Sequence, residues 1–321
     1  MDVIMLTETR LRQAVALAEH GSFRRAARAL GVSQPALTRG IQALEASLGV
    51  PLFDRQSTSV TLTEFGDLAL ERLKTMLTAE LELRRDIALL RGLDTGHVSV
   101  ALGPYPSVIS GYSAAARLIR QHPKLGVTLQ VMNWRQVTSA VSERRADLGL
   151  AELSDAVLND ALGTELVGRH RARAFCRPGH PILRSKQITL RDLLQFPWVH
   201  TRLPPRVSAA FPRPPGRAGQ IDAQTRDFLP AIEVDVPMQL AEFVRDSDAL
   251  AFGPLSLVER ELEAGELAVL HSSVFDLRAS YGFIYLKDRS LSPGAKAYMQ
   301  AVREQETLCA AREARLARIY E

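Results

Sequence analysis

The segment SFRRAARALGVSQPALTRGIQALEASLGVPLFDR, residues 22–55, decides the fold of the amino-terminal part of the chain. Its first serine is a helix N-cap residue, and apolar side chains then recur at the spacing of one helix face until Gly31. Ser33 begins a further helix, which Gly49 ends. Upstream, the same apolar spacing predicts a helix over residues 7–20. The pattern therefore predicts three short helices that share one core.

The short Gly31-Val32-Ser33 link between the second and third predicted helices fits the turn of a helix-turn-helix, whose second helix enters the major groove of DNA. The N-cap and the side chains off the buried stripe of the third helix are candidates for hydrogen bonds to base edges or phosphates: Ser33, Gln34, Pro35, Thr38, Arg39 and Gln42. An ordinary solvated helix face is the alternative that spacing alone leaves open.

The segment 22–55, with its SQPAL and LF-R landmarks, and the following TLTEFG stretch (61–66) resemble the DNA-binding segment of LysR-type transcriptional regulators. The resemblance implies an all-α winged helix-turn-helix over residues 1–63. It places Gln34, Pro35, Thr38 and Arg39 toward the groove and Arg55 of the wing beside the phosphate backbone. The planar guanidinium of Arg39 suits bidentate pairing with guanine.

The charge of residues 1–63 is modest, since seven arginines against five acidic residues give 7 − 5 = +2. The residues after the wing arginine, 56–59, are polar and uncharged. We therefore expect weak wing contacts, and bulk charge alone cannot supply the affinity for DNA.

A long linker helix is predicted over residues 64–92, because its apolar side chains follow alternating steps of four and three. The seam carries one polar residue, Glu80, and its apolar members are the candidate dimerisation residues: Leu73, Met76, Leu83, Ile87 and Leu90. A helix packed on the core of its own chain is the alternative. Pairing has a functional reason, because two recognition helices together bind an inverted repeat.

Residues 93–321 alternate strand-like and helix-like segments, which predicts a mostly parallel α/β fold in two lobes. Their order resembles the effector-binding domain of LysR-type regulators, which is similar to periplasmic solute-binding proteins. We assign lobe I to about 93–166 and 273–321, and lobe II to about 167–272. The proline-rich and arginine-rich stretch 203–220 is expected to be an irregular surface loop near the mouth of the cleft, with a basic DNA-binding patch as the less favoured interpretation.

Ligands of open α/β sheets bind beyond the carboxyl ends of strands, and the family resemblance points to the same loops. That rule selects the candidate effector-binding residues Tyr105, Ser107, Asn133, Trp134, Gln136, His200, Thr201, Arg202 and Asp235. Aromatic rings suit an apolar wall, and arginine suits a carboxylate, so we favour an anionic or zwitterionic effector. Glu152 and Asp235 leave open an amine ligand or the neutralisation of Arg135.

The sequence contains no GxSxG, HExxH, GxGxxG or GxxxxGK[ST] motif, and we expect a regulator rather than an enzyme. An enzyme or transport receptor with two lobes is the rival function. The two cysteines, Cys176 and Cys309, have no partners at metal-ligand spacing, so we expect no metal, no cofactor and two buried thiols. No signal peptide or membrane span is evident, which predicts a cytoplasmic protein without membrane contact.

The expected partners are double-stranded operator DNA, a small-molecule effector and a second copy of the chain. The resemblance implies a homodimer that commonly assembles into a homotetramer, and the sequence leaves these two states open. We expect the effector to act by changing DNA geometry or contact with RNA polymerase, and not at the DNA-binding helix directly.

Overall fold

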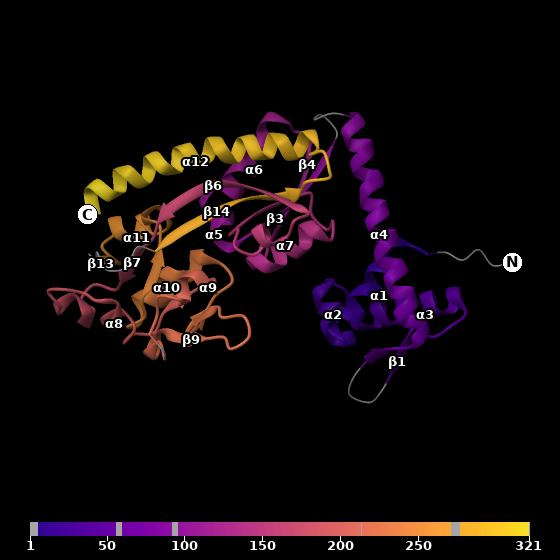
Figure 1. Ribbon diagram of the computed structural model, residues 1–321, viewed down its shortest axis with the longest axis horizontal. Coiled ribbons are helices and arrows are strands. Elements are labelled where there is room, and N and C mark those ends of the chain that lie inside the picture. The colour runs from indigo at the N-terminus through magenta and orange to yellow at the C-terminus, as the bar shows by residue number, and fades with distance from the viewer. Residues whose placement is uncertain (1–5, 56–59, 92–95, 213, 271–276, 321) are drawn as a thin grey trace. The chain divides into compact units, whose positions relative to one another are not determined.

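The computed structural model describes residues 6–55, 60–91, 96–212, 214–270 and 277–320. Packing divides the chain into two compact units, residues 1–87 and 88–321. Figure 1 shows that the smaller, N-terminal unit is mainly helical, whereas the C-terminal unit holds most of the strands. The predicted linker, residues 64–92, spans this division.

The N-terminal unit contains three short helices, a two-stranded wing and a long helix. These are α1 (Glu8–His20), α2 (Phe23–Ala29), α3 (Gln34–Leu48), β1 (Phe53–Arg55), β2 (Val60–Leu62) and α4 (Glu64–Arg91). Gly21 and Gly49 end α1 and α3 in the left-handed conformation, at φ 56° and 72°. The Ser33 side chain accepts a hydrogen bond from the Ala36 amide at 3.3 Å, so the predicted cap of α3 is confirmed. The Ser22 backbone is extended, but its side chain forms no cap bond.

Two glycines of the N-terminal unit lie close to neighbouring groups of its core. Leu37 and Ile41 of α3 are fully buried against α1 and α2. A Cβ at Gly40 would lie 1.8 Å from Oε1 of Gln13, and a Cβ at Gly66 would lie 2.0 Å from the Leu52 carbonyl oxygen. The backbone contact explains the glycine in the first turn of α4, whereas the flexible Gln13 side chain could move away from a Cβ at position 40.

Lobe I is built on a five-stranded sheet with the order β4-β3-β5-β14-β6. Its elements are β3 (His97–Leu102), α5 (Pro104–Pro106), a π-helical turn (Ser107–Gly111), α6 (Tyr112–Gln121), β4 (Gly126–Val131), α7 (Trp134–Ser142), β5 (Leu148–Ala151), a 3₁₀ turn (Ala156–Leu158), β6 (Leu162–Arg171), β14 (Arg278–Leu286) and α12 (Pro293–Tyr320). Strand β3 pairs in parallel with β4 and β5, as predicted, whereas β14 is antiparallel to β5 and β6. Helices α6 and α12 cover one face and α7 the other.

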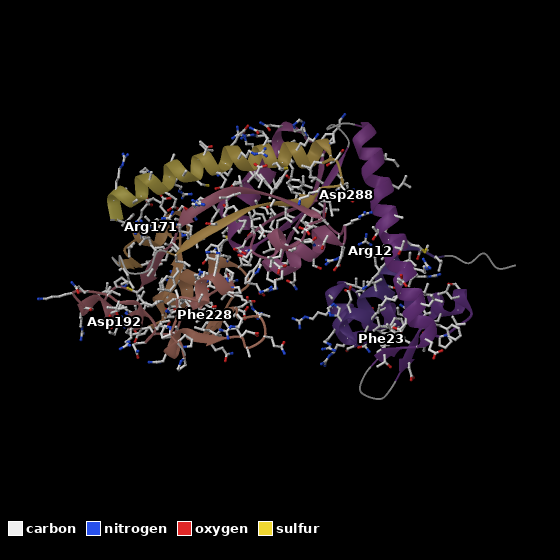
Figure 2. The ribbon with its side chains drawn as sticks, in the orientation of Figure 1. Arg12, Phe23, Arg171, Asp192, Phe228 and Asp288 are labelled. Atoms are coloured by element: carbon white, nitrogen blue, oxygen red, sulfur yellow. The ribbon has the colours of Figure 1, made fainter. Side chains whose placement is uncertain are left out.

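Lobe II carries a three-stranded antiparallel sheet, β12-β7-β13, and two strand pairs, β11-β8 and β10-β9. Its strands are β7 (Arg173–Cys176), β8 (Val199–His200), β9 (Gly219–Ile221), β10 (Phe228–Pro230), β11 (Ile232–Glu233), β12 (Ala251–Gly253) and β13 (Ala268–Leu270). Its helices are α8 (Leu190–Leu193), α9 (Pro205–Ser208), α10 (Leu240–Arg245) and α11 (Glu259–Glu263), with short 3₁₀ turns at Pro181–Arg184, Gly216–Ala218, Pro237–Gln239 and Leu255–Leu257. The rings of Trp198, Phe211, Phe228 and Phe252 meet in its core, where Figure 2 locates Phe228.

Helix α12 packs on both lobes (Figure 1). Tyr298 and Val302 belong to the lobe I core, whereas Leu316 is 1% exposed and belongs to a lobe II core. In the same part of α12, Glu313 accepts hydrogen bonds from the amides of Leu255 and Ser256, at 3.1 and 2.8 Å. The carboxyl-terminal end of the chain, predicted as part of lobe I, therefore serves both lobes.

Two features of the C-terminal unit were not predicted, and one expectation needs correction. Strand β6 was not predicted, because its two glycines and its charged residues leave neither a continuous apolar run nor a strict alternation along this edge strand. Helix α12 continues to Tyr320, since no glycine or proline follows Gly294. The stretch 203–220 is not an irregular loop throughout, because it forms α9 and buries Val207 and Phe211 in lobe II.

Candidate functional site

The amino-terminal half of α3 presents an exposed polar face. Gln34, Pro35, Arg39 and Gln42 are exposed, and Arg39 has no ion-pair partner within the described residues. Thr38 is half-buried, and its hydroxyl donates to the Gln34 carbonyl at 3.0 Å. The face therefore offers free donors and acceptors of the kind that contact DNA, with Thr38 the most restrained of them.

The wing is held to α3 by a carboxylate that the sequence analysis did not single out. Oε1 of Glu45 accepts hydrogen bonds from the amides of Leu52 and Phe53, at 2.9 and 3.1 Å. Strand β1 then pairs with β2 in an antiparallel hairpin that includes the Arg55 backbone. The Arg55 side chain and residues 56–59, on which the expected wing contacts fall, lie outside the described part of the chain.

Helix α2 adds a basic surface that was also missed. Arg24, Arg25 and Arg28 are exposed, while Ala26 and Ala27 between them are buried. The first helix of a helix-turn-helix crosses the DNA backbone, so these guanidinium groups suit phosphate contacts. The sequence RRAAR in this helix could have indicated the basic surface.

The apolar side chains of α4 differ in exposure. Leu73 is 4% exposed and belongs to the core of the N-terminal unit, so it packs within its own chain. Met76, Leu83 and Ile87 are 42%, 60% and 41% exposed. The predicted seam thus divides into one residue that joins the core and three that face away from it, while the Leu90 side chain lies outside the described part.

A pocket of about 630 Å³, including its open mouth, lies between lobe I and lobe II. Five of the predicted effector-binding residues line it: Tyr105, Trp134, His200, Thr201 and Arg202. Strand β14 contributes Ala279, Ser280 and Tyr281, and the start of α9 contributes Arg206 and Val207. These last two groups were not predicted, because their place in the wall depends on long-range packing rather than on a strand-end rule.

A buried hydrogen-bond network crosses the pocket from lobe I to lobe II. The single proton of the Tyr105 hydroxyl is shared between the Phe252 carbonyl, at 2.6 Å, and Nε2 of His200, at 2.7 Å. Nδ1 of His200 lies 2.7 Å from the Thr201 carbonyl, to which a neutral ring donates. Burial lowers the pKa of His200 to about 4. The ring is therefore neutral at pH 7, and it stacks on Tyr105 with 5.0 Å between centroids.

The charged side chains of the pocket form pairs at its edge. Nε of Arg206 donates to Glu152 at 3.0 Å, and Nε of Arg202 donates to Glu233 at 3.2 Å. The side chains of Arg202 and Arg206 are 34% and 41% exposed. The Arg202–Glu233 pair is partly exposed on both sides and therefore weak enough in water to be exchanged for a ligand anion, whereas Glu152 is only 17% exposed.

Four predicted effector-binding residues do not line this pocket. Ser107 is 1% exposed, and its hydroxyl donates to the Pro104 carbonyl at 2.6 Å. Asn133 and Gln136 form the capping box of α7 with each other, and Asp235 is exposed beyond β11. The first three side chains serve local structure, so the strand-end rule selected their loops but not their roles.

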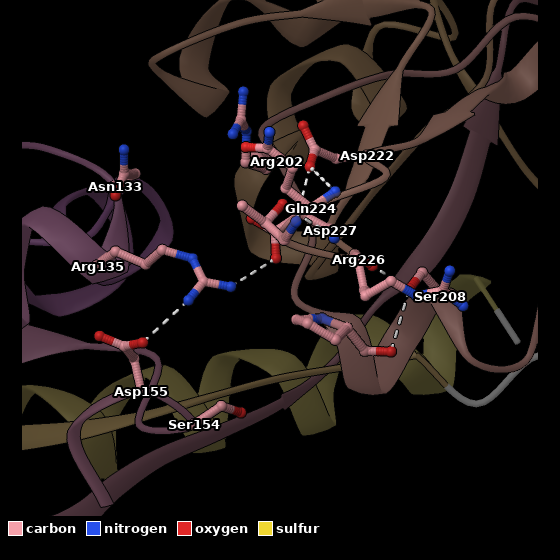
Figure 3. A network of polar contacts seen from close by, with 12 residues as sticks. Asn133, Arg135, Ser154, Asp155, Arg202, Ser208, Asp222, Gln224, Arg226 and Asp227 are labelled. Atoms are coloured by element: carbon pink, nitrogen blue, oxygen red, sulfur yellow. Dashed lines mark hydrogen bonds and ion pairs between the residues drawn. The ribbon is translucent and has the colours of Figure 1, made fainter. Parts of the chain in front are cut away.

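Arg135 links the two lobes (Figure 3). Its guanidinium donates to Asp155 of lobe I at 3.0 Å and to Asp227 of lobe II at 2.9 Å. Asp227 is fully buried, and its second carboxylate oxygen has no hydrogen-bond partner within the described residues. Glu152 and Asp235, the carboxylates expected to neutralise Arg135, are not its partners.

The described residues contain no group of three or more metal-ligating side chains, and none of their helices is long and apolar enough to cross a membrane. Cys176 and Cys309 are both buried and free. Burial raises the pKa of the Cys176 thiol to about 12, which disfavours thiolate chemistry there.

Comparison with protein families decides what these two units are. The model of the bacterial regulatory helix-turn-helix protein, lysR family, matches residues 9–67, and that of the LysR substrate binding domain matches residues 91–307. The chain belongs to the LysR family. This regulator thus combines a helix-turn-helix DNA-binding domain with an effector-binding domain.

Individual relatives of this LysR-family chain are transcriptional regulators. The SDS degradation transcriptional activation protein of a Pseudomonas species is 35% identical over 300 residues, which cover 92% of this chain and 95% of the relative. The HTH-type transcriptional regulator GbpR of Azospirillum brasilense is 29% identical over 297 residues, with coverage of 90% and 83%. The full-length structure of the Vibrio cholerae virulence activator AphB shares the fold, with a TM-score of 0.62 at 15% identity and coverage of 92% and 98%.

Proposed function

We propose that this LysR-family regulator binds double-stranded operator DNA through the exposed face of α3 and takes its effector in the pocket between the two lobes. The observation that carries the proposal is that both lobes line the pocket. Tyr105 of lobe I and His200 of lobe II are hydrogen-bonded across it. A ligand that contacts both lobes can favour one lobe arrangement over another, whereas a ligand with equal affinity for both shifts no equilibrium.

The charge of the pocket supports an anionic or zwitterionic effector. Arg202, Arg206 and Arg278 line it against one carboxylate, Glu152, among the described lining residues. Guanidinium groups suit the oxygens of carboxylates and sulfates. The Pseudomonas relative is named for SDS degradation, and SDS is itself an organic anion. Its negative charge would complement the arginines of this pocket.

The output of the regulator is a change in DNA geometry or in contact with RNA polymerase. Its candidate effector residues and its candidate DNA-binding residues belong to different units of the chain. Regulation of transcription, and not catalysis, is the role that its relatives support. A regulator of chromosomal DNA in a bacterium works in the cytoplasm.

One exposed face of α4 provides the surface for a homodimer. Met76, Leu83 and Ile87 are separated by seven and four residues, so they share one helix face, and all three are exposed. Leu83→Asp places a charge on that face and should weaken both the dimer and operator binding. Sedimentation at low micromolar concentration measures the first effect. A variant that stays dimeric with normal affinity for DNA would contradict this surface, and a wild type that sediments as a tetramer would show a further interface.

Selection of duplexes from a random pool by the full-length protein tests the DNA-binding proposal. We expect enrichment of an inverted repeat whose half-sites lie about one duplex turn apart. With the enriched duplex at fixed salt, Arg39→Ala should cost about 1 to 3 kcal/mol of binding free energy and relax the choice of one base per half-site. Arg184→Ala, on the exposed surface of lobe II, is the matched loss of a guanidinium. Equal affinity and base preference for Arg39→Ala and wild type would remove Arg39 from the interface.

A further inference from the structure

The inner wall of the pocket is apolar. Tyr105, Trp134, Leu203, Phe252 and Leu277 line it, and each is at most 9% exposed. Prolines from both lobes, Pro104 and Pro204, extend the same surface. A ligand gains free energy from this wall in proportion to the apolar area that it buries there.

The two tyrosine hydroxyls of the pocket already have partners. The Tyr105 hydroxyl serves the Phe252 carbonyl and His200. The Tyr281 hydroxyl donates to Glu306 of α12 at 2.5 Å, so it points away from the pocket. Glu306 in turn forms a buried pair with His170 at 2.8 Å. Among the described residues, no buried side-chain atom that lacks a hydrogen-bond partner belongs to the pocket lining. A ligand with many hydroxyl or amine groups would therefore bury them without partners, at a cost for each.

The cationic groups lie toward solvent instead. Arg202 and Arg206 are about one-third or more exposed, in contrast to the buried apolar wall. Arg202 is held by one oxygen of Glu233, an exposed side chain that an incoming anion can replace. Arg206 is held by one oxygen of Glu152, which is 17% exposed, and also donates to the Arg278 carbonyl at 3.4 Å, so its guanidinium is held in place beside Arg202. The pocket thus separates an apolar interior from a cationic edge.

Resting on the function proposed above, we propose that the effector is an amphiphilic anion: a single unbranched hydrocarbon chain that lies against Trp134, Leu203 and Leu277, with a sulfate or carboxylate head on Arg202 and Arg206. The chain contributes most of the affinity, and the head sets the orientation. Small hydrophilic anions such as inorganic sulfate match the edge but leave the wall unused.

Titration calorimetry of the full-length protein with butyl, hexyl and octyl sulfate, each below its micelle concentration, tests the chain. Affinity should rise about fourfold for each added methylene, as expected for burial in an apolar site. Octanoate compares the carboxylate head with the sulfate head, and 1-octanol removes the charge. We expect octanol to bind about tenfold or more weakly than the preferred octyl anion, because it loses the charge-assisted hydrogen bonds.

Two variants locate the binding. Arg206→Gln should reduce the preference for octyl sulfate over octanol, whereas Arg184→Gln, an exposed arginine of lobe II outside the pocket, should leave it unchanged. Ala279→Leu fills the pocket from β14 and should abolish binding. Circular dichroism shows whether that variant folds, and the chain-length series on the wild type stands without it.

An affinity that does not depend on chain length, or equal binding of octanol and both octyl anions, would overturn the ligand class. So would binding at many sites that all variants share, since it would mean adsorption of surfactant to the protein surface. Operator binding of the same preparations separates the two proposals: if no alkyl anion binds while the operator binds normally, the ligand class fails and the proposed function stands.

Discussion

The exposed face of α3 and the pocket of the effector-binding domain are built in opposite ways. Arg39 on α3 is exposed and has no ion-pair partner within the described residues, whereas Arg206 and Arg135 of the effector-binding domain each pair with carboxylates. A surface for a large polyanion leaves its side chains free, because the partner supplies enough charge to order them. A pocket for a small ligand instead holds its side chains in place beforehand, and binding exchanges partners.

The largest effect that separates the two units is expected for Ile41→Ala. Ile41 is fully buried in the N-terminal unit, and its truncation should cost about 2 to 5 kcal/mol of stability there. Both tryptophans of the chain, Trp134 and Trp198, lie in the C-terminal unit, so their fluorescence reports that unit alone.

In urea, circular dichroism should show earlier unfolding of the variant, while the tryptophan transition stays in place. Gln42→Ala, at the neighbouring exposed position, controls for changes in α3. A tryptophan transition that shifts by the same amount would mean that the two units unfold as one.

His200 should make the stability of the effector-binding domain fall in acid. Burial lowers its pKa in the folded state to about 4, below the value of about 6.5 expected for an unfolded chain. The unfolded state therefore binds more protons between these values, and stability is lost as pH falls from about 6.5 to 4.

The expected loss from His200 is roughly 3 kcal/mol by pH 4. Urea unfolding followed by tryptophan fluorescence at several pH values measures it. The difference between wild type and His200→Gln isolates this group from the carboxylates, and a difference that does not change with pH would contradict the neutral ring.

The link between the lobes should show coupling in a double-mutant cycle. Arg135→Gln leaves the buried carboxylate of Asp227 without its cation and should cost about 1 to 3 kcal/mol, less than a fully buried pair because the Arg135 side chain is 39% exposed. Asp227→Asn in the same chain removes the unpaired charge, so the double variant should cost less than the sum of the single ones. Strict additivity in urea unfolding would show that the pair contributes no mutual stabilisation.

The smallest expected effect is that of Thr201→Val. Thr201 lines the pocket and is 7% exposed, and valine keeps its volume but removes the hydroxyl. The response of operator binding to octyl sulfate should shift about fivefold, whereas binding without the ligand stays intact. Footprinting over a ligand titration measures both. A normal dose response, or loss of operator binding without ligand, would place the effector site elsewhere.

The DNA-binding domain was the more predictable part of the molecule. Its first and third helices are short, and glycine ends both while serine begins the third, so Gly21, Ser33 and Gly49 predicted these bounds. The contacts that could not be predicted are tertiary ones. Glu45 accepts a hydrogen bond from the wing segment seven residues away, and Leu73 of the long helix packs into the core. Apolar spacing on α4 cannot distinguish the side chains that pack within their own chain from those that stay exposed.

In the effector-binding domain, prediction reached the loops but not the complete pocket. Tyr105 and His200 follow or end strands, where the rule for parallel sheets applies. Tyr281 enters through β14, whose place beside β5 and β6 depends on pairing between distant parts of the chain. The partners of Arg135 were missed for the same reason, since Asp227 lies 92 residues away.

The attachment of α12 to both lobes limits how an effector can be sensed. Its first half is fixed in the core of lobe I, and near its end Leu316 and Glu313 fix it to lobe II. This continuous helix bridges the two lobes. The lobes therefore cannot rotate apart as freely as two domains that are joined only by flexible strands. A ligand that rotates one lobe against the other would have to bend α12 or slide its far end. Such a displacement would be small compared with the closure of a lid. It would change the outer surface of α12, where a bound ligand would first alter the surface of the domain.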